Sequence, residues 1–194
     1  MSKPEVQVSM GKLDLEPERI AELSVLLSED ERERAGRFYF ERDRRRFTVA
    51  RGLLRVELGR RMQAPPARLN FVYNAFGKPA LKDSSLQFNI SHSAELVLIA
   101  IADASEVGVD VEFVRPQPEM HRIAERVFSP SELALFQSTP TDAQTEMFYR
   151  LWTQKEARLK ASGTGFAAPA DPAWSVRSID PEAGYVGAIA WHKL

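Results

Sequence analysis

The chain has 194 residues and a formal net charge of −1, and 44% of its residues are hydrophobic while 27% are charged. These values are typical of a globular protein that buries a sizeable core, and they argue against a nucleic-acid-binding protein. Because the chain has no cysteine, disulfides, thiolate metal sites and a cysteine nucleophile are excluded. No apolar run has membrane length, and the opening MSKPEVQVSM does not resemble a signal peptide, so a cytoplasmic location is expected.

Hydrophobic periodicity predicts two long helices. The first is expected from about residue 41 to the Ala-Pro-Pro sequence at 64–66, because apolar side chains recur there at helical spacing. These side chains are Phe47, Ala50, Leu54, Leu58 and Met62. The second is expected to open at Thr141, the first residue of a capping box with Gln144, and to end at Gly163.

Shorter elements are expected around these helices. Short helices are predicted over residues 17–27, after the N-cap Ser28, over 119–126, and over 131–137 behind a capping box at Ser129. Strands are predicted over residues 5–13, 70–73, 87–90, 96–102, 107–112, 174–177 and 185–191, with a turn at 74–79. Each half thus has a long helix and a few strands, which predicts two related α+β subdomains packed together.

Arginines crowd the segment from Arg32 to Arg68. Such a block can oppose phosphates on one side of the molecule. It can equally be a solvated helix face with intrahelical ion pairs, and the segment alone favours this second interpretation.

The stretch VGVDVEF, residues 107–113, places two carboxylates on one face of a predicted strand. Side chains at i and i+2 of a strand point the same way, so Asp110 and Glu112 lie roughly 6–7 Å apart at the backbone and can reach one cation. Carboxylate ligands with substrate phosphates are the usual environment of Mg²⁺. Because exposed acids on strands are common, this motif alone leaves a solvated edge possible.

The stretch LWTQKEARLK, residues 151–160, carries charged residues on a partly apolar helix face. On a helical wheel one broad arc holds Phe148, Trp152, Lys155, Glu156 and Leu159, with Lys160 at its border. A purely structural helix would tend to turn Lys155 and Glu156 outward. The alternative to a functional role is an ion pair between Glu156 and Lys160 at i,i+4.

Two further stretches offer polar side chains to an anion. In FNISHS, residues 88–93, serine hydroxyls and an imidazole stand at the end of a predicted strand and can bind phosphate oxygens. Adjacent strand residues point to opposite faces, so His92 cannot activate Ser91 as in a hydrolase. In FGKP, residues 76–79, Lys78 on a tight turn can reach an anion.

These four stretches, in the order FGKP, FNISHS, VGVDVE and WTQKEARLK, resemble the 4′-phosphopantetheinyl transferases of the surfactin (Sfp) type. The resemblance runs from about Ser28 to Gly165. WTQKEA is the form seen in the branch that serves secondary-metabolite and broad-range carrier proteins, as opposed to the FxxKES form.

The resemblance implies an α+β fold of two pseudo-symmetric subdomains, each a small antiparallel sheet packed on a long helix. The subdomains would span residues 1–103 and 104–194, with the active site in the cleft between them. The family transfers phosphopantetheine from coenzyme A to a serine of a carrier protein and releases adenosine 3′,5′-bisphosphate.

The resemblance also implies roles for individual residues. Asp110, Glu112 and Glu156 match three carboxylates that bind Mg²⁺ against the pyrophosphate, with Mn²⁺ as a possible substitute. Glu156 also matches the proposed general base for the incoming serine, directly or through a water. Lys160, and with it Lys155, would stabilise phosphoryl oxygens.

The nucleotide of coenzyme A would be bound by the first half of the chain. His92 and Arg34 match residues that reach the 3′-phosphate. The other positions that match the nucleotide pocket are Lys78, Asn89 and Ser91. The sequence departs from the family at Glu31, where some relatives have lysine, and either Arg37 or Arg51 is expected to replace that cation.

The implied partners are coenzyme A and an acyl or peptidyl carrier protein of fatty acid, polyketide or nonribosomal peptide biosynthesis. The segment 113–126, with Arg115, Arg122 and Arg126, is expected to help dock the acidic helix of the carrier. A monomer is expected, because the Sfp type is one chain with two similar halves, and neither nucleic acid nor a membrane is expected as a partner.

Three alternatives fit the residues less well. A Mg²⁺-dependent nuclease or phosphohydrolase needs an E-x-K pair on a strand, which does not follow Glu112. An RNA-binding module leaves the carboxylate pair and WTQKEA unexplained. A degenerate transferase that only binds carriers is disfavoured by the intact acidic residues.

Overall fold

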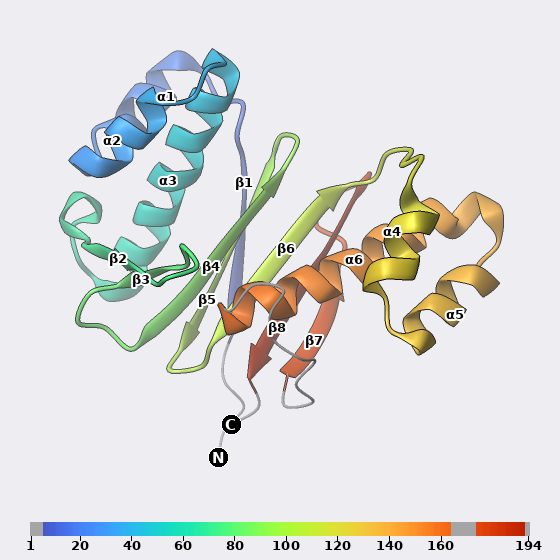
Figure 1. The fold of residues 1–194 in the computed structure, drawn as a ribbon. Coiled ribbons are helices and arrows are strands. Elements are labelled where there is room, and N and C mark those ends of the chain that lie inside the picture. Colours follow the sequence, from blue (N-terminus) through green and yellow to red (C-terminus); the bar gives the residue numbers. More distant parts are fainter. Residues whose placement is uncertain (1–5, 164–173, 193–194) are drawn as a thin grey trace.

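The computed structural model describes residues 6–163 and 174–192 and shows a mixed α+β fold (Figure 1). Glu5 of the first predicted strand, Gly165 and the outer ends of the two predicted subdomains lie outside these residues. The elements of the first half are β1 (Val6–Lys12), α1 (Pro17–Ser24), α2 (Glu29–Gly36), α3 (Glu41–Met62), η1 (Pro66–Arg68), β2 (Phe71–Tyr73), β3 (Pro79–Leu81), β4 (Leu86–Ser93) and β5 (Leu96–Asp103). Those of the second half are β6 (Val107–Phe113), α4 (Met120–Val127), α5 (Pro130–Ser138), α6 (Thr141–Ser162), β7 (Trp174–Ile179) and β8 (Tyr185–His192).

Each half of the chain contributes one antiparallel three-stranded sheet and one helix of 22 residues. The strand order is β1-β5-β4 in the first sheet and β6-β8-β7 in the second, while β2 and β3 form a separate hairpin. Small antiparallel sheets with a long helix in each half confirm the predicted fold class. Sheet membership changes between β5 and β6, yet the division at residue 103 stays a prediction.

The two faces of β5 explain why the run LVLIAIA is apolar throughout. Val97, Ile99 and Ile101 pack with α3, β4 and the β2–β3 hairpin. Leu98, Ala100 and Ala102 belong instead to a core shared with the valines of β6 and with Ile189 of β8. The strand is therefore buried on both sides, between its own helix and the second sheet.

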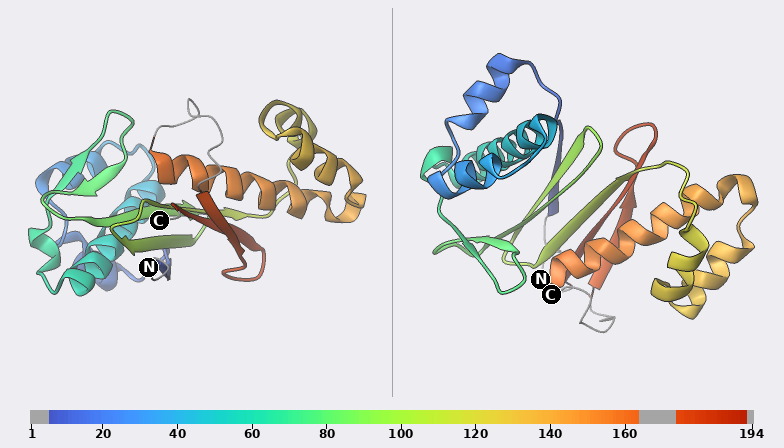
Figure 2. Two further views of the ribbon diagram at one scale, coloured as in Figure 1. Left: turned by 90° about the horizontal axis from the view of Figure 1, so that it is seen from below. Right: turned by 45° about the horizontal axis from the view of Figure 1, so that its top comes forward.

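Helix α6 lies across β6 and β8, and α4 and α5 lie against its N-terminal part (Figures 1 and 2). The contact with the sheet is made by small side chains on both partners, Ala157 and Ala161 on the helix and Ala188 and Ala190 on β8. A separate aromatic core holds α4 and α5, and it includes Phe128, Phe136 and Phe148. No described helix combines the length and the apolar character needed to cross a lipid bilayer.

Several helix ends follow the predictions, although α1 ends at Ser24 and not at Leu27. Ser129 and Glu132 form the expected capping box, and Gly163 closes α6 in the left-handed conformation with φ of 65°. The capping box predicted at Thr141 is wrong, because Thr141 is already the first helical residue and Pro140, which has no side-chain acceptor, is the N-cap. The predicted turn at 74–79 also misses β3, which begins at Pro79.

Candidate functional site

The strand β6 turns its valines and its carboxylates to opposite sides, as its alternation predicts. Val107, Val109 and Val111 are buried against the first sheet. Gly108 and its same-face neighbours face α6, because a Cβ on Gly108 would overlap the backbone of Ala157 and Ala161. The glycine thus lets α6 approach β6 closely, and this approach brings Glu156 and Lys160 toward Asp110.

Asp110 is the buried centre of the candidate site, with 3% of its surface exposed. Its Oδ1 accepts hydrogen bonds from Lys160 Nζ at 2.6 Å and from Ser91 Oγ at 2.8 Å. Its Oδ2 is the one buried side-chain nitrogen or oxygen atom of the described residues that has no hydrogen-bond partner. Burial raises the pKa of Asp110, and the neighbouring Lys160 and Ser91 oppose that rise. A buried carboxylate oxygen without a protein partner makes Asp110 a candidate ligand for a cation.

Glu112 stands two residues further along the same face. Its Oε2 accepts a hydrogen bond of 2.7 Å from the Oγ of Ser93. Burial raises the pKa of Glu112, Ser93 lowers it, and the charge of Asp110 raises it again. The influence of Asp110 indicates that the two carboxylates share one electrostatic environment, as their spacing predicts.

Glu156 comes to the same environment from α6. Burial raises the pKa of Glu156, and the charges of Asp110 and Glu112 raise it further while Lys160 lowers it. The ion pair of Lys160 runs to Asp110, so the intrahelical pair with Glu156 that a purely structural helix would make is not its main contact. Glu156 and Lys160 line a pocket of about 270 Å³ together with Lys78, Pro79 and Asn89 of the first half.

Polar side chains of β4 connect the two sheets beside these carboxylates. Backbone N–H groups of β6 donate to side chains of β4 at three positions: Val109 to Asn89 at 3.0 Å, Val111 to Ser91 at 3.4 Å and Phe113 to Ser93 at 3.1 Å. Side chains of β4 thus replace the backbone partner that β6 lacks on this edge.

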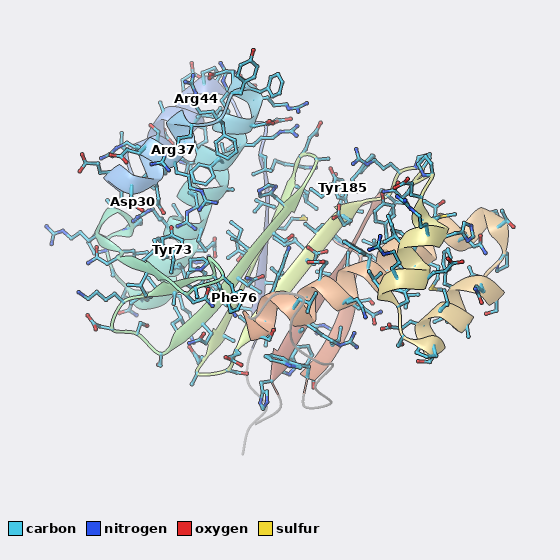
Figure 3. All side chains as sticks on the ribbon, in the orientation of Figure 1. Asp30, Arg37, Arg44, Tyr73, Phe76 and Tyr185 are labelled. Carbon is cyan, nitrogen blue, oxygen red and sulfur yellow. The ribbon has the colours of Figure 1, made fainter. Side chains whose placement is uncertain are left out.

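The β2–β3 hairpin holds the C-terminal end of α6. Lys78 Nζ donates to the carbonyl of Ala161 at 2.6 Å, and Asn74 Nδ2 donates to the carbonyl of Gly163 at 3.0 Å. Burial lowers the pKa of Lys78. Phe76, at the tip of the same hairpin, lies beside this helix end (Figure 3). The predicted anion-binding lysine is therefore engaged with backbone carbonyls at the rim of the pocket.

The remaining predicted residues of the first half lie at different distances from this cluster. Partial burial, followed by the charges of Lys160 and Arg46, lowers the pKa of His92, so the imidazole is near both cations. Arg34 is exposed, with its guanidinium 5.4 Å from the ring centroid of Phe47. Arg37 is exposed beside Glu33.

Arg51 belongs to a buried ion-pair network centred on Glu31. Glu31 accepts hydrogen bonds from Arg51 Nε at 2.9 Å and from Arg55 Nε at 2.6 Å, and Arg51 also donates to the hydroxyl of Tyr73. These arginines lower the pKa of Glu31 against the effect of burial. Arg51, which was predicted to bind a phosphate in place of a lysine at position 31, is therefore bonded to Glu31 itself.

Lys155 points away from the carboxylates. Its Nζ lies 3.6 Å from Oε2 of Glu132, the capping-box residue of α5. Lys155 therefore links α6 to α5 through this ion pair, whereas Lys160 of the same helix pairs with Asp110.

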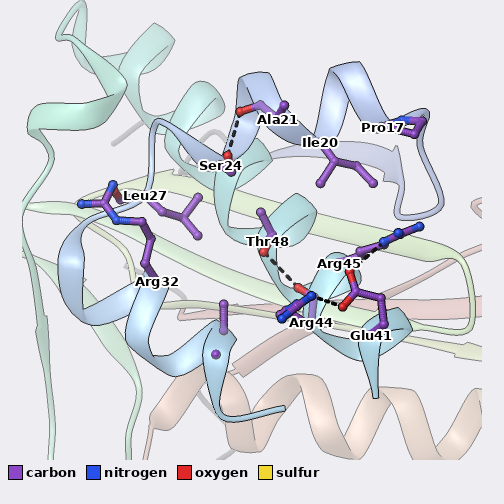
Figure 4. A pocket seen from close by; sticks show the side chains of 12 residues that line it. Pro17, Ile20, Ala21, Ser24, Leu27, Arg32, Glu41, Arg44, Arg45 and Thr48 are labelled. Carbon is purple, nitrogen blue, oxygen red and sulfur yellow. Dashed lines mark hydrogen bonds and ion pairs between the residues drawn. The ribbon is translucent and has the colours of Figure 1, made fainter. Parts of the chain in front are cut away.

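A larger pocket of about 470 Å³ lies between α1, α2 and α3 (Figure 4). Its lining is apolar at Ile20, Ala21 and Leu27, and the charged groups drawn at its rim are already paired, as Arg44 and Arg45 are with Glu41. Because it offers no convergent reactive groups, the smaller pocket beside Asp110 is the better candidate.

The donor set beside Asp110 suits a hard cation. Among the described residues no three acidic or histidine side chains already stand as a formed metal cage. The charge of Asp110 nevertheless raises the pKa of Glu112 and of Glu156, the charge of Glu112 also raises that of Glu156, and Oδ2 of Asp110 is unpartnered. Carboxylate oxygens that repel one another are stabilised by a cation of the Mg²⁺ type, so these residues fit the ion.

Comparisons with known proteins identify the family. Residues 106–191 match the model of the 4′-phosphopantetheinyl transferase superfamily, and residues 16–104 match that of the 4′-phosphopantetheinyl transferase N-terminal region. The 4′-phosphopantetheinyl transferase HetI of Nostoc is 38% identical over 206 residues, which cover 96% of this chain and 87% of HetI.

The chain belongs to the 4′-phosphopantetheinyl transferase superfamily. Sfp of Bacillus subtilis is 35% identical over 152 residues, covering 78% of this chain and 66% of Sfp, and AcpT of Escherichia coli K12 is 38% identical over 110 residues, covering 56% of this chain and 53% of AcpT. This 4′-phosphopantetheinyl transferase is therefore an enzyme, as the motifs predict.

Two residues that shape the site, Gly108 and Ser93, were given no role of their own by the sequence. Ser93 had a signal in FNISHS, because it shares a strand face with Asn89 and Ser91. Gly108 had a weaker signal as a glycine inside a strand, which often marks a close backbone approach.

Proposed function

We propose that this transferase moves the 4′-phosphopantetheine group from coenzyme A to a serine of an apo acyl or peptidyl carrier protein in a Mg²⁺-dependent reaction. The products are the holo-carrier and adenosine 3′,5′-bisphosphate. The observation that carries the proposal is the unpartnered, buried Oδ2 of Asp110, beside Glu112 and next to a pocket that contains Glu156 and Lys160.

Asp110, Glu112 and Glu156 would hold the metal ion, and Mn²⁺ has the same preference for oxygen ligands. When bound, the ion would neutralise charge on the pyrophosphate of coenzyme A. In the metal-free protein Lys160 compensates Asp110 instead, at 2.6 Å. Lys160 would then turn to the phosphoryl oxygens when the cation takes over that compensation.

The reaction breaks one phosphorus–oxygen bond and forms another. The serine oxygen of the carrier attacks the phosphorus that bears pantetheine, and adenosine 3′,5′-bisphosphate leaves with the bridging oxygen. Glu156 would take the serine proton, directly or through a water. Burial and two neighbouring carboxylates raise the pKa of Glu156, which moves it toward the range in which a general base works near neutral pH.

The nucleotide would lie along the first half of the chain. Support is strongest for Asn89, Ser91 and His92, which lie on β4 beside the pocket or near Lys160. Lys78 would need to release the carbonyl of Ala161, and Lys155 and Arg51 would need to release Glu132 and Glu31. Arg34, which is exposed, is free of such an acidic partner among the described ion pairs and would reach the 3′-phosphate.

The carrier protein would dock near α4. This helix exposes Arg122 and Arg126, and Phe113 at the end of β6 is also exposed. An acidic carrier helix complements these arginines. We further propose that the enzyme acts as a monomer in the cytoplasm, with the site at the seam between the two sheets.

One incubation tests the proposal. Apo-carrier protein, coenzyme A and Mg²⁺ are mixed with the enzyme, and the intact mass of the carrier is measured. The carrier should gain one phosphopantetheine unit, and EDTA or Asp110→Asn should abolish the gain. A panel of acyl and peptidyl carriers that gains no mass with the wild-type enzyme would contradict the proposed reaction.

A further inference from the structure

We infer that Ser93 is a positioning residue that orients the Glu112 carboxylate for the metal ion. This inference rests on the proposed function, because it assumes that Glu112 is a metal ligand. Ser93 belongs to β4 of the first half and Glu112 to β6 of the second, so the contact crosses the seam between the sheets.

Ser93 holds two neighbouring groups of β6 with one oxygen atom. Its Oγ donates to Glu112 Oε2 at 2.7 Å and accepts from the backbone N–H of Phe113 at 3.1 Å. A hydroxyl has one proton to donate and lone pairs to accept with, so both bonds can form together. The side chain of Glu112 is thereby fixed relative to its own backbone.

Three side chains of β4 accept a backbone N–H of β6, and whether each of them also donates depends on the residue that precedes that N–H in β6. Asn89, whose Oδ1 can only accept, receives the N–H of Val109, and the residue before Val109 is Gly108, which has no side chain to hold. Ser91 and Ser93 receive the next two N–H groups and also donate to the carboxylates of Asp110 and Glu112. Serine thus stands where a carboxylate needs a donor.

Glu112 depends on this donor more than Asp110 does. Asp110 is held by Lys160 as well as by Ser91, and it is almost fully buried. Glu112 is half-buried, and Ser93 is its hydrogen-bond donor among the described side chains. The free oxygen Oε1 of Glu112 is then presented in a fixed direction, which lowers the entropic cost of binding a cation.

The test compares hydroxyl-bearing and hydroxyl-free side chains of equal shape. Ser93→Thr keeps the hydroxyl, and Ser93→Val gives the shape of threonine with a methyl group in place of that hydroxyl. Threonine and valine both have high strand propensity, so both variants are expected to keep the fold. Ser9→Ala is the matched control, because Ser9 Oγ also donates to a glutamate, Glu57 Oε2 at 3.0 Å, away from the site. Ser93→Ala is the fourth variant.

Each protein is titrated with Mn²⁺, with and without coenzyme A, and free Mn²⁺ is measured by electron paramagnetic resonance. Ser93→Val and Ser93→Ala should weaken Mn²⁺ binding about tenfold, while Ser93→Thr and Ser9→Ala stay within about twofold of the wild type. Equal binding by Ser93→Val and Ser93→Thr would overturn the role of Ser93 and leave the proposed reaction standing. A wild-type protein that binds no Mn²⁺ in either condition would overturn both.

Discussion

Lys160 on α6 places its ammonium nitrogen 2.6 Å from Oδ1 of Asp110 on β6, and 2.9 Å from the hydroxyl of Ser91 on β4. Three elements therefore meet at one ion pair. Asp110 is buried, whereas Lys160 retains about a third of its side-chain surface, so the pair lies at the inner wall of the pocket. Lys160 compensates a carboxylate that would otherwise be buried and alone.

This relationship predicts strong coupling between the two residues. Lys160→Met should destabilise the metal-free protein by about 2 kcal/mol, because it leaves the buried Asp110 without its cation. Adding Asp110→Asn should recover most of that loss, since a neutral amide needs no counter-charge. Urea unfolding of the four proteins of the cycle measures the coupling, and additive losses would show that the pair contributes little.

Close packing at Gly108 predicts that even one methyl group damages the site. Gly108→Ala should lower stability by about 3 kcal/mol, because the new Cβ overlaps the backbone of α6 at Ala157 and Ala161. It should also lower the specific activity of the folded protein, since Glu156 and Lys160 move with the helix.

Gly36→Ala is the control for this change. Gly36 ends α2, and a Cβ there meets nothing within 4 Å. Thermal unfolding should show a fall of several degrees for Gly108→Ala and no fall for Gly36→Ala. Equal melting temperatures for the two variants would mean that α6 has room to shift.

The buried Glu31 predicts a specific loss of stability in acid. Arg51 and Arg55 hold the pKa of Glu31 below its usual value. A carboxylate with a depressed pKa stabilises the fold above its unfolded pKa, and that contribution is lost as the pH falls through the folded pKa. Wild type should therefore exceed Glu31→Gln by about 3 kcal/mol at pH 6–8, and the difference should shrink below about pH 4.

Chemical unfolding across this pH range measures the difference. Glu29→Gln, an exposed change on the same helix, is the control and should track the wild type. A constant gap between wild type and Glu31→Gln down to pH 2 would contradict the ion-pair account.

The local features of the fold could be predicted from the sequence. Helix α3 begins and ends as expected, because apolar spacing and the Pro65-Pro66 pair act within a few residues of the chain. The two faces of β6 follow in the same way from the alternation of valine and carboxylate. The error at Thr141 is also local, since Pro140 could take the N-cap position in its place.

The long-range features could not be predicted in this way. From the sequence, Arg37 or Arg51 was expected to supply the phosphate-binding cation that is absent at Glu31. In the structure Glu31 is paired with Arg55, 24 residues away, and with Arg51 itself. Lys78 lines the pocket but donates to a backbone carbonyl of α6, and Lys155 is paired with Glu132 of α5. Such partners depend on how distant segments pack, which hydrophobic periodicity does not encode.

Charge on α4 predicts an effect on the carrier protein alone. Arg122→Glu combined with Arg126→Glu should raise the KM for the carrier roughly tenfold and leave the KM for coenzyme A unchanged, because these side chains are exposed and lie outside the pocket. Steady-state kinetics with each substrate varied in turn separates the two constants. Arg19→Glu on α1 is the control, and equal damage to both constants would refute docking at α4.

The central claim is that Asp110, Glu112 and Glu156 bind one divalent cation at the seam between the sheets. The most direct measurement is a crystal structure with Mn²⁺ and coenzyme A, in which anomalous scattering locates the metal. We predict an anomalous peak next to Oδ2 of Asp110, with Lys160 moved from its ion pair toward the phosphates. No peak there, with Lys160 still bound to Asp110 beside an ordered coenzyme A, would contradict the account.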